Sequence, residues 1–306
     1  MVNQERFLVR FWGVRGSYPT PGPHTLRHGG NTSCIEIQAG LQKLIFDAGS
    51  GIIQLGEALM RESKKQAALN LALFITHAHG DHLVGFPFFS PLFDARTHLH
   101  LFGPQLAGHS VEQLVTSVMS PPSFPVDIHT LPSQRFYHTV TDTLCVCWLP
   151  DQQEPQIEEH YTKEQADALD PKKVYVTARF THSHPLNGAV IYRIDYAEHS
   201  VVYATDVEWK NGCEPDFLSF VKGADVLIHD AQYSTEDYRR GKHGFGHSTI
   251  EMATTAARQT HARHLILFHH EPTYDDTQLD RLEAAAQRRF ASTRSAFEGM
   301  EIDLLS

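Results

Sequence analysis

The stretch Thr76-His77-Ala78-His79-Gly80-Asp81-His82 (THAHGDH) places three imidazoles and one carboxylate directly after the apolar run LNLALFI. One hydrogen bond can satisfy a single buried histidine. Four ligand-type side chains this close together would repel or desolvate one another unless a cation held them. The stretch therefore predicts a metal site that follows a buried strand.

The composition is that of an ordinary globular protein. Hydrophobic residues make up 41% and charged residues 20% of the 306 positions, and no run approaches the roughly 20 apolar residues that span a bilayer. The N-terminus MVNQERFLVRFWG lacks a secretory pattern, and the four cysteines lack a disulfide or zinc-ribbon spacing. We therefore expect a soluble, cytoplasmic protein with reduced thiols and no membrane partner.

The formal net charge of −10 argues against a surface that gathers long polyanions, because such surfaces need clustered lysine and arginine. A small anionic substrate is still compatible with this charge, since a metal pair can bind a phosphate inside an acidic protein. We therefore expect a small substrate and no long nucleic acid as a partner.

Short apolar runs of strand type alternate with a few helical patterns along two comparable halves of the chain, which predicts an α/β sandwich. Strands are expected at 6–13, 33–38, 42–47, 71–76, 97–103, 144–149, 174–180, 189–194, 200–205, 224–229 and 264–268. Helices are expected at 51–65, around 108–120 and at 248–262. The acidic stretch 151–173 is interpreted as a polar surface insertion.

Ligand-type residues follow several of the apolar runs, at the points where an α/β scaffold presents functional side chains. One isolated histidine would more often be a core or surface residue, but several clusters at strand ends predict one shared site. The clusters are His77 to His82, His182 with His184, Asp206, His229 with Asp230, and His269 with His270.

These residues resemble the metallo-β-lactamase superfamily, whose signature His-x-His-x-Asp-His is met by His77, His79, Asp81 and His82. The motifs GVRGSYPTPG, GGNTSC, LIFDAGSGI, LIHDAQY, GHST and LFHHEP resemble its phosphodiesterase branch. That branch includes bacterial cyclic-nucleotide phosphodiesterases and, more distantly, tRNA 3′-processing endonucleases. The resemblance implies one domain over 1–306, an αββα sandwich of two mixed sheets flanked by helices, and a homodimer as a plausible assembly.

The resemblance also implies two divalent metal ions. Zn²⁺ suits imidazole and carboxylate ligands, with Mn²⁺ or Fe²⁺ as alternatives. His184, followed by Pro185, matches the family pattern for the later ligand of the first ion, and His182 is the alternative. His270 would lie beside the ligands. The implied ligands are His77, His79 and His184 for one ion, Asp81, His82 and His269 for the other, and Asp206 between them.

Two metals can share a hydroxide that attacks a phosphoryl group. Asp81 is interpreted as a ligand that orients this hydroxide, because a carboxylate on a divalent cation is a poor base. Asp230 and His247 match a proton-donating pair of the tRNA-processing relatives. The structural alternative for His247 is entry to a helix that Ser248 caps, with Glu251 completing a capping box.

Weaker expectations concern the surroundings of the site. Asp47 would order the metal loop, Arg15 and His243 would contact phosphate, and two further groups would have structural or substrate roles. These groups are Asn31, Thr32 and Ser33 in a glycine-rich loop, and Phe86, Phe88 and Phe89 as a wall on which a base could stack.

The leading functional hypothesis is a dinuclear phosphodiesterase that hydrolyses a cyclic nucleotide, with Asp81, Asp230 and His247 as catalytic residues. The first alternative is a tRNA 3′-end endoribonuclease, ranked lower because the 151–173 insertion is acidic rather than basic. The second alternative is a non-catalytic metal-binding scaffold. It is disfavoured because the chain retains a candidate for every ligand.

Overall fold

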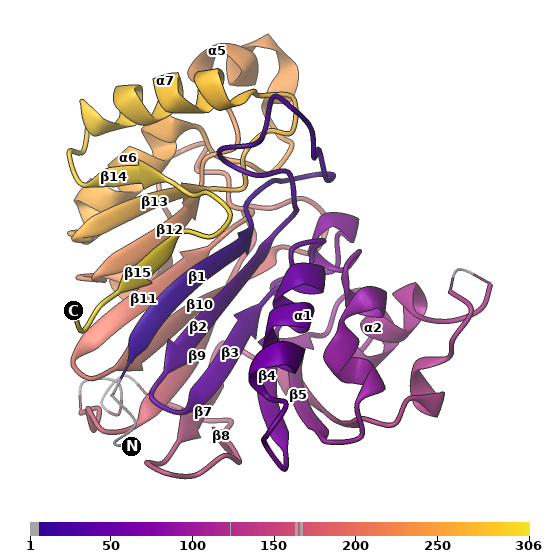
Figure 1. Ribbon diagram of the computed structural model, residues 1–306. Coiled ribbons are helices and arrows are strands. Elements are labelled where there is room, and N and C mark those ends of the chain that lie inside the picture. The colour runs from indigo at the N-terminus through magenta and orange to yellow at the C-terminus, as the bar shows by residue number, and fades with distance from the viewer. Residues whose placement is uncertain (1–5, 123, 163–164, 166–167) are drawn as a thin grey trace.

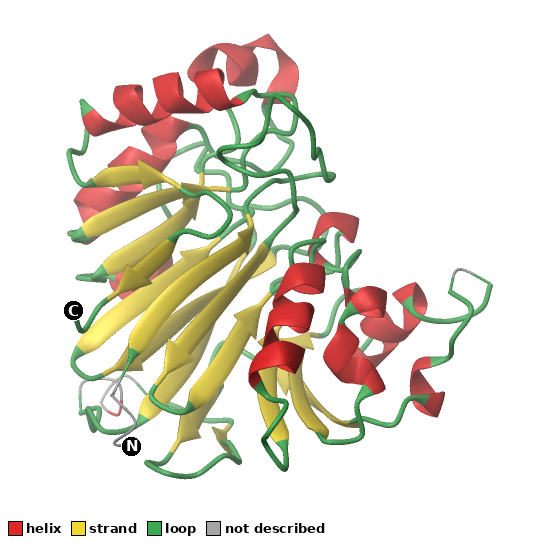
Figure 2. Cartoon of the chain, viewed as in Figure 1, coloured by secondary structure: helices red, strands yellow, loops and turns green. Residues whose placement is uncertain are grey.

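A computed structural model describes residues 6–122, 124–162, 165 and 168–306 of the chain. Two sheets lie face to face, and helices cover the outer face of each (Figures 1 and 2). This is the αββα sandwich of two mixed sheets that the sequence predicts. Among the described residues, no helix has the length and apolar character needed to cross a bilayer.

The first sheet is antiparallel at one edge and parallel from β3 to β6. Its strands, in spatial order, are β15 (Glu301–Asp303), β1 (Phe7–Gly13), β2 (Cys34–Ala39), β3 (Gln42–Phe46), β4 (Leu69–Phe74), β5 (Thr97–Pro104) and β6 (Gln134–Val140).

The second sheet is parallel from β11 to β14 and antiparallel elsewhere. Its strands, in spatial order, are β14 (Thr293–Ser295), β13 (His264–Phe268), β12 (Val226–Asp230), β11 (His199–Ala204), β10 (Ala189–Tyr196), β9 (Val174–Thr181), β7 (Cys145–Trp148) and β8 (Gln156–Glu158).

Stacked aromatic rings fill the space between the sheets. Phe46, Phe74 and Phe102 lie in register on β3, β4 and β5, with ring centroids 5.1 Å and 4.6 Å apart. Tyr192 and Tyr203 of the opposite sheet pack against Phe46. Burial of such large side chains removes much apolar surface from water, so these rings hold the sheets together immediately below the site.

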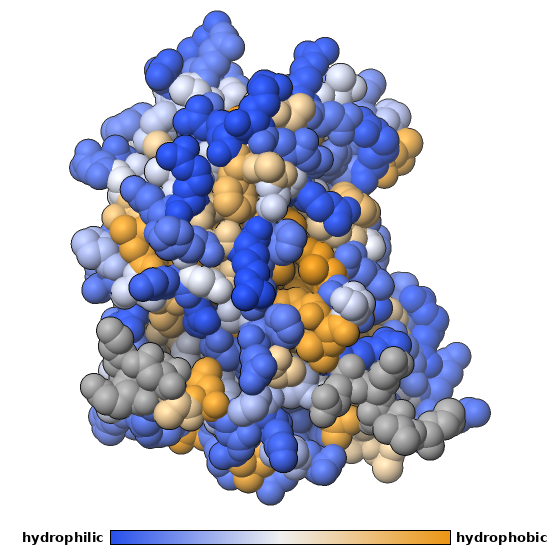
Figure 3. Space-filling view, turned by 90° about the vertical axis from the view of Figure 1, so that its left-hand side faces the viewer, coloured by the Kyte–Doolittle hydropathy of each residue, from blue (hydrophilic) through white to orange (hydrophobic). Residues whose placement is uncertain are grey.

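Helices bury apolar side chains on the outer faces of the sheets. One outer core joins the first sheet to α1 (Ile52–Glu62) and α2 (Val111–Val118) through side chains such as Leu55 and Val115. The other joins the second sheet to α4 (Pro215–Val221), α6 (Ile250–Thr260) and α7 (Asp276–Gln287). Hydrophilic residues cover most of the face in Figure 3, and the largest apolar patch lies near its centre.

The strands direct the predicted ligands to one edge of the sandwich. β11, β12 and β13 are parallel, so Asp206, Asp230 and His269 at their carboxyl ends meet at that edge. His77 follows β4 of the other sheet, and the two sheets are joined there by a hydrogen bond from Val190 N to Thr76 O of 3.0 Å. Strand direction thus brings residues from both sheets to one place.

Some elements were not predicted from the sequence. The edge strand β6 has a mixed polar pattern, and β14 and β15 have three residues each, so only pairing with neighbours defines them. Helix α7 is mostly polar and buries few apolar side chains. Part of the predicted 151–173 insertion is described and contributes β8, while 163–164 and 166–167 lie outside the described residues.

The predicted cap of α6 was misplaced by one residue. Thr249 is the N-cap, and its hydroxyl accepts a hydrogen bond from Met252 N at 3.3 Å. Ser248 instead donates its hydroxyl to Val207 O at 2.7 Å and its backbone N–H to Asp230 at 3.1 Å. Ser248 does not cap the helix, because its buried polar groups form hydrogen bonds with residues that follow β11 and end β12.

The signature loop ends in the short helix η1 (Gly80–His82), and the short helices η2 (Phe86–Phe88) and η3 (Ser90–Phe93) follow it. Short helical turns also occur at η4 (Ile128–Thr130), α5 (Thr235–Asp237) and η5 (Tyr238–Lys242). The last two lie between β12 and α6, next to the site.

Candidate metal centre

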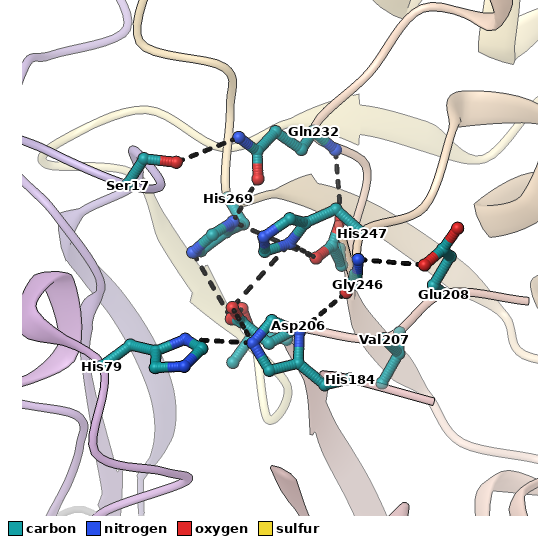
Figure 4. Close-up of polar contacts among 12 residues, drawn as sticks. Ser17, His79, His184, Asp206, Val207, Glu208, Gln232, Gly246, His247 and His269 are labelled. Atoms are coloured by element: carbon teal, nitrogen blue, oxygen red, sulfur yellow. Dashed lines mark hydrogen bonds and ion pairs between the residues drawn. The ribbon is translucent and has the colours of Figure 1, made fainter. Parts of the chain in front are cut away.

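The carboxylate of Asp206, 1% exposed, lies at the centre of the cluster, and Figure 4 shows it among His184, His247 and His269. Each of its oxygens faces a different pair of ring nitrogens. Oδ1 is 3.6 Å from His77 Nε2 and 3.7 Å from His184 Nε2. Oδ2 is 3.1 Å from His82 Nε2 and 3.4 Å from His269 Nε2. One carboxylate therefore joins two groups of ring nitrogens.

His79 and Asp81 complete these groups. His79 Nδ1 lies 3.0 Å from His184 Nε2, on the Oδ1 side. Asp81 Oδ2 lies 3.1 Å from His269 Nε2 and 3.5 Å from His82 Nε2, on the Oδ2 side. The structure thus brings together all seven residues that the sequence predicts as ligands.

The donor set fits divalent cations. His77 Nε2 is buried and has no hydrogen-bond partner among the described residues, although it points at Asp206. Within each group the candidate ligand atoms lie within 4.8 Å of one another. Imidazole nitrogens and carboxylate oxygens that converge in this way match divalent metal ions.

Four of the rings are also fixed through their other nitrogen, as metal-binding histidines usually are. A hydrogen-bond partner on the far side sets the orientation of each ring. The pairs are His77 Nδ1 with Thr76 Oγ1 at 3.1 Å, His82 Nδ1 with Asp47 Oδ2 at 2.8 Å, His184 Nδ1 with Gly246 O at 2.9 Å, and His269 Nδ1 with Gln232 Oε1 at 3.1 Å.

Asp47 orders the loop from below, as expected. It is fully buried and accepts hydrogen bonds from Thr76 N at 2.8 Å, from the Thr76 hydroxyl and from Tyr203 OH at 2.9 Å. His82 Nδ1 is a further hydrogen-bond partner, so residues from both sheets contact the oxygens of the Asp47 carboxylate. The sequence does not show the contribution of Tyr203.

Asp47→Asn should weaken metal binding about 10- to 100-fold, because the amide cannot hold the His82 ring as the carboxylate does. Donors left unsatisfied should also lower the free energy of unfolding by about 1–3 kcal/mol. Chelator competition and urea unfolding measure the two effects. Tyr203→Phe is the matched control: it removes one donor and keeps the charge, so its metal affinity should stay closer to that of wild type. Equal affinities for Asp47→Asn and wild type would contradict this role.

The charge states within the cluster favour the binding of cations. Burial alone would raise the pKa of Asp81, but His82 and His269 hold it well below its usual range. The pKa of Asp206 is likewise held low by His269 and His82 against the effect of burial. Burial, and then His82, lower the pKa of His77, which leaves that ring neutral with a lone pair to offer.

Asp230 and His247 form a pair beside the cluster. His247 Nδ1 lies 2.7 Å from Asp230 Oδ2, while Asp230 Oδ1 accepts from the backbone N–H groups of Ser248 and Gln232, each at 3.1 Å. The His247 ring stacks on that of His269, with centroids 4.8 Å apart. Because Nδ1 is held by the carboxylate, Nε2 is the ring nitrogen that can exchange a proton with a substrate.

Three supporting residues were missed from the sequence. Gln232 holds His269 and donates to Ser17 Oγ at 3.2 Å, and Ser17 N donates to Asp81 Oδ2 at 2.7 Å (Figure 4). Glu208 is buried and accepts from Gly246 N at 2.9 Å. Gln232 and Ser17 carried a signal, since Gln232 stands two positions after Asp230 and Ser17 lies in the GVRGSYPTPG motif.

Some weaker expectations are corrected. Arg15 does not reach the site, because its guanidinium donates to the backbone oxygens of Gly29, Glu271 and Tyr274. His270 turns its Nε2 to Ala296 O at 3.0 Å instead of supporting the ligands. Both residues fasten the loop that follows β13.

Other expectations are narrowed. His182 is exposed, whereas His184 lies in the cluster. Phe86 and Phe89 are fully buried in the outer core, so of the three aromatic residues Phe88, 55% exposed, is the one open to solvent. Asn31 has a structural role, as its backbone and side chain both donate to Glu298.

Known proteins resemble this chain over most of its length. A family model described as "Beta-lactamase superfamily domain" matches residues 42–270. Ribonuclease Z of Thermoplasma acidophilum is 28% identical over 97% of this chain and 96% of its own length. Ribonuclease Z of Pyrococcus furiosus is 27% identical over 87% of each chain. The human tRNase Z short form shares the fold, with a TM-score of 0.60 and 21% identity over 96% of this chain and 98% of its own.

These relatives overturn one expectation about partners. They are ribonucleases by name, so proteins that align with nearly the whole chain act on a polynucleotide. The expectation of no long nucleic acid, drawn from the net charge of −10, is wrong. A net charge sums over the whole surface and does not report the local field at a site.

Proposed function

The chain belongs to the beta-lactamase superfamily and is a metal-dependent phosphodiester hydrolase, and we propose that its substrate is RNA, cut endonucleolytically in the manner of a tRNA 3′-processing enzyme. The Asp230–His247 pair, which lies directly against the cluster centred on Asp206, supports the phosphodiester chemistry, and the ribonuclease Z relatives support the choice of RNA. A site for phosphodiesters needs a proton for the leaving oxygen, and this pair is placed to supply it.

Two divalent ions, with zinc the best match to these ligands, would supply Lewis acidity at the phosphoryl group and activate a water molecule. Asp206, which faces ligand-type nitrogens through both of its oxygens, would contribute to holding both ions. The other residues that would hold them are His77, His79 and His184 for one ion and Asp81, His82 and His269 for the other.

The protein's own groups then arrange the reactants. Asp81 is oriented by the Ser17 N–H at 2.7 Å and keeps its negative charge, so it acts as a ligand and acceptor and not as a base. Hydrolysis joins the water oxygen to phosphorus and breaks the bond to the leaving oxygen. Protonated His247 gives that oxygen a proton from Nε2, and Asp230 stabilises the protonated ring before the transfer. The proton that the attacking water loses passes to solvent.

A cyclic nucleotide is the weaker of the two substrate hypotheses. The RNA and cyclic-nucleotide hypotheses use the same metals and the same proton donor, so the local motifs do not distinguish between the two substrates. The relatives aligned over 87–97% of the chain are named ribonuclease Z, which supports the RNA reading.

Incubation of the metal-loaded protein with a tRNA precursor that carries a 3′ extension should give one cut where the acceptor stem meets the 3′ extension. Gel analysis of end-labelled precursor locates the cut, and chelation of the metal should abolish it. A panel of 2′,3′- and 3′,5′-cyclic nucleotides serves as the comparison. Turnover of cyclic nucleotides without cleavage of any precursor would overturn the proposal.

A further inference from the structure

A short basic segment stands directly before His247 in this acidic chain. Residues 239–245 (RRGKHGF), called here the basic segment, carry two arginines, a lysine and a histidine, although the chain has 36 acidic and 26 basic residues in total. Arg239, Arg240 and His243 are exposed, and Phe245 is 54% exposed. We propose that the basic segment binds the RNA strand on the leaving-group side of the scissile phosphate, an inference that rests on the proposed function.

The basic segment is firmly attached to the site. Glu208, buried at the end of β11, accepts hydrogen bonds from Tyr238 OH at 2.6 Å, Gly244 N at 2.8 Å and Gly246 N at 2.9 Å. Gly246 O in turn lies 2.9 Å from His184 Nδ1 (Figure 4). The backbone on both sides of Phe245 is therefore fixed relative to the cluster.

Gly246 allows the close approach. Its φ of 92° is a left-handed conformation, and a Cβ there would lie 2.3 Å from His184 Nδ1 and 2.1 Å from Pro185 Cδ. The C-terminal end of the basic segment, next to Gly246, thus lies near the turn that carries Pro185 and Leu186, and Leu186 is 92% exposed. Exposed apolar side chains from two loops border the cluster at this point.

The side chains of the basic segment suit a nucleic acid strand. Lys242 Nζ lies 5.5 Å from the ring centroids of both Tyr233 and Phe245, which holds its positive charge next to an exposed ring. An exposed aromatic ring can stack on a base, and neighbouring cations can contact the phosphates on either side. A protein or an apolar ligand would not require this combination.

Nearby acids do not cancel these charges. Arg240 NH2 contacts Glu236 at 2.6 Å, but both side chains are exposed, and such pairs contribute little. Asp237 is engaged by Tyr274 and Ser234. Arg240 can therefore exchange its carboxylate for a phosphate at small cost, while Arg239 and His243 extend the same exposed surface.

The position of the basic segment decides which part of the strand it contacts. His247 follows the segment by two residues and would protonate the leaving oxygen. The nucleotides attached to that oxygen must leave past the residues next to His247. A basic and aromatic surface there would hold these nucleotides while the bond breaks, and it would not touch a small phosphodiester.

The test compares two arginine pairs. Arg239→Ala/Arg240→Ala removes charge from the basic segment. Arg288→Ala/Arg289→Ala removes the same charge from exposed positions just after α7, near β14, which pairs with the start of β13 and so lies away from His269. Binding is measured by the anisotropy of a labelled single strand of about 12 nucleotides at several salt concentrations. Turnover of bis(p-nitrophenyl) phosphate reports whether each variant is folded and metal-loaded.

We expect the Kd of the Arg239/Arg240 variant to rise at least about fivefold, and the slope of log Kd against log salt to fall by about 1, since each phosphate contact on a single strand contributes about 0.7. Phe245→Ala should raise Kd without changing the slope. The control pair should match wild type, and all variants should keep bis(p-nitrophenyl) phosphate turnover.

Two results would overturn the basic segment as an RNA contact: wild type that binds no RNA, or equal Kd and slope for both arginine variants. If wild type cleaves RNA while both arginine variants bind it equally well, the inferred RNA contact of the basic segment is wrong and the proposed function stands. If the Arg239/Arg240 variant loses RNA binding but wild type cleaves no RNA, the RNA contact of the basic segment is confirmed and the proposed function is wrong.

Discussion

Asp206→Asn should hydrolyse phosphodiesters about 10³ times more slowly than wild type or worse, with fewer metal ions bound. Each oxygen of this carboxylate faces a different pair of ring nitrogens, at 3.6 and 3.7 Å on one side and at 3.1 and 3.4 Å on the other. An amide offers only one oxygen and no charge, so it cannot serve both ions. Lewis-acid stabilisation of several kcal/mol is then lost, and about 4 kcal/mol corresponds to about 10³ in rate.

Asparagine is the substitution of choice because Asp206 has a φ of 55°, a conformation that asparagine adopts more readily than alanine. Metal content by elemental analysis and turnover of bis(p-nitrophenyl) phosphate measure the two effects. Asp216→Asn, an exposed position in the first turn of α4, is the matched control and should match wild type. Wild-type metal content together with wild-type turnover in Asp206→Asn would refute a bridging role.

His247→Asn should keep its metal ions and lose about 10²- to 10⁴-fold in kcat on RNA, the contribution expected of a positioned general acid. Its Nδ1 is held by Asp230 at 2.7 Å and lies 3.8 Å from Asp206 Oδ1, and its ring stacks on His269, so we expect Nδ1 to stay on Asp230 and not to hold an ion. The loss should depend on the leaving group. A p-nitrophenolate leaves without a proton, so its release should be slowed far less than that of an RNA hydroxyl.

The ratio of the activities on the two substrates distinguishes the loss of a general acid from damage to the fold. Structural damage would lower both activities together, and so would loss of metal. His261→Asn is the control, because His261 is exposed and caps α6 in a left-handed conformation that asparagine tolerates. Equal losses on both substrates in His247→Asn would contradict the role as proton donor.

Local patterns were a good guide to the elements that are continuous apolar runs. The runs that became β4, β11, β12 and β13 are short and continuously apolar, and the ligand-type residues follow them directly. The three-residue strands β14 and β15 contain no apolar run, and only pairing with a neighbouring strand defines them. The misplaced cap at Ser248 has the same origin, because Val207 and Asp230 compete for its polar groups.

The sequence by itself determined the superfamily and the strand ends that carry the candidate ligands, with His182 and His184 as alternatives, because a six-residue signature and apolar runs are local properties of the chain. The tertiary structure decided which oxygen of Asp206 faces which histidines, and it revealed the support from Glu208, Gln232 and Tyr203. Such contacts join residues as far apart as His79 and His184, or Asp81 and His269, which are 105 and 188 positions apart. Only closure of the two sheets brings such groups together, so no local pattern encodes them.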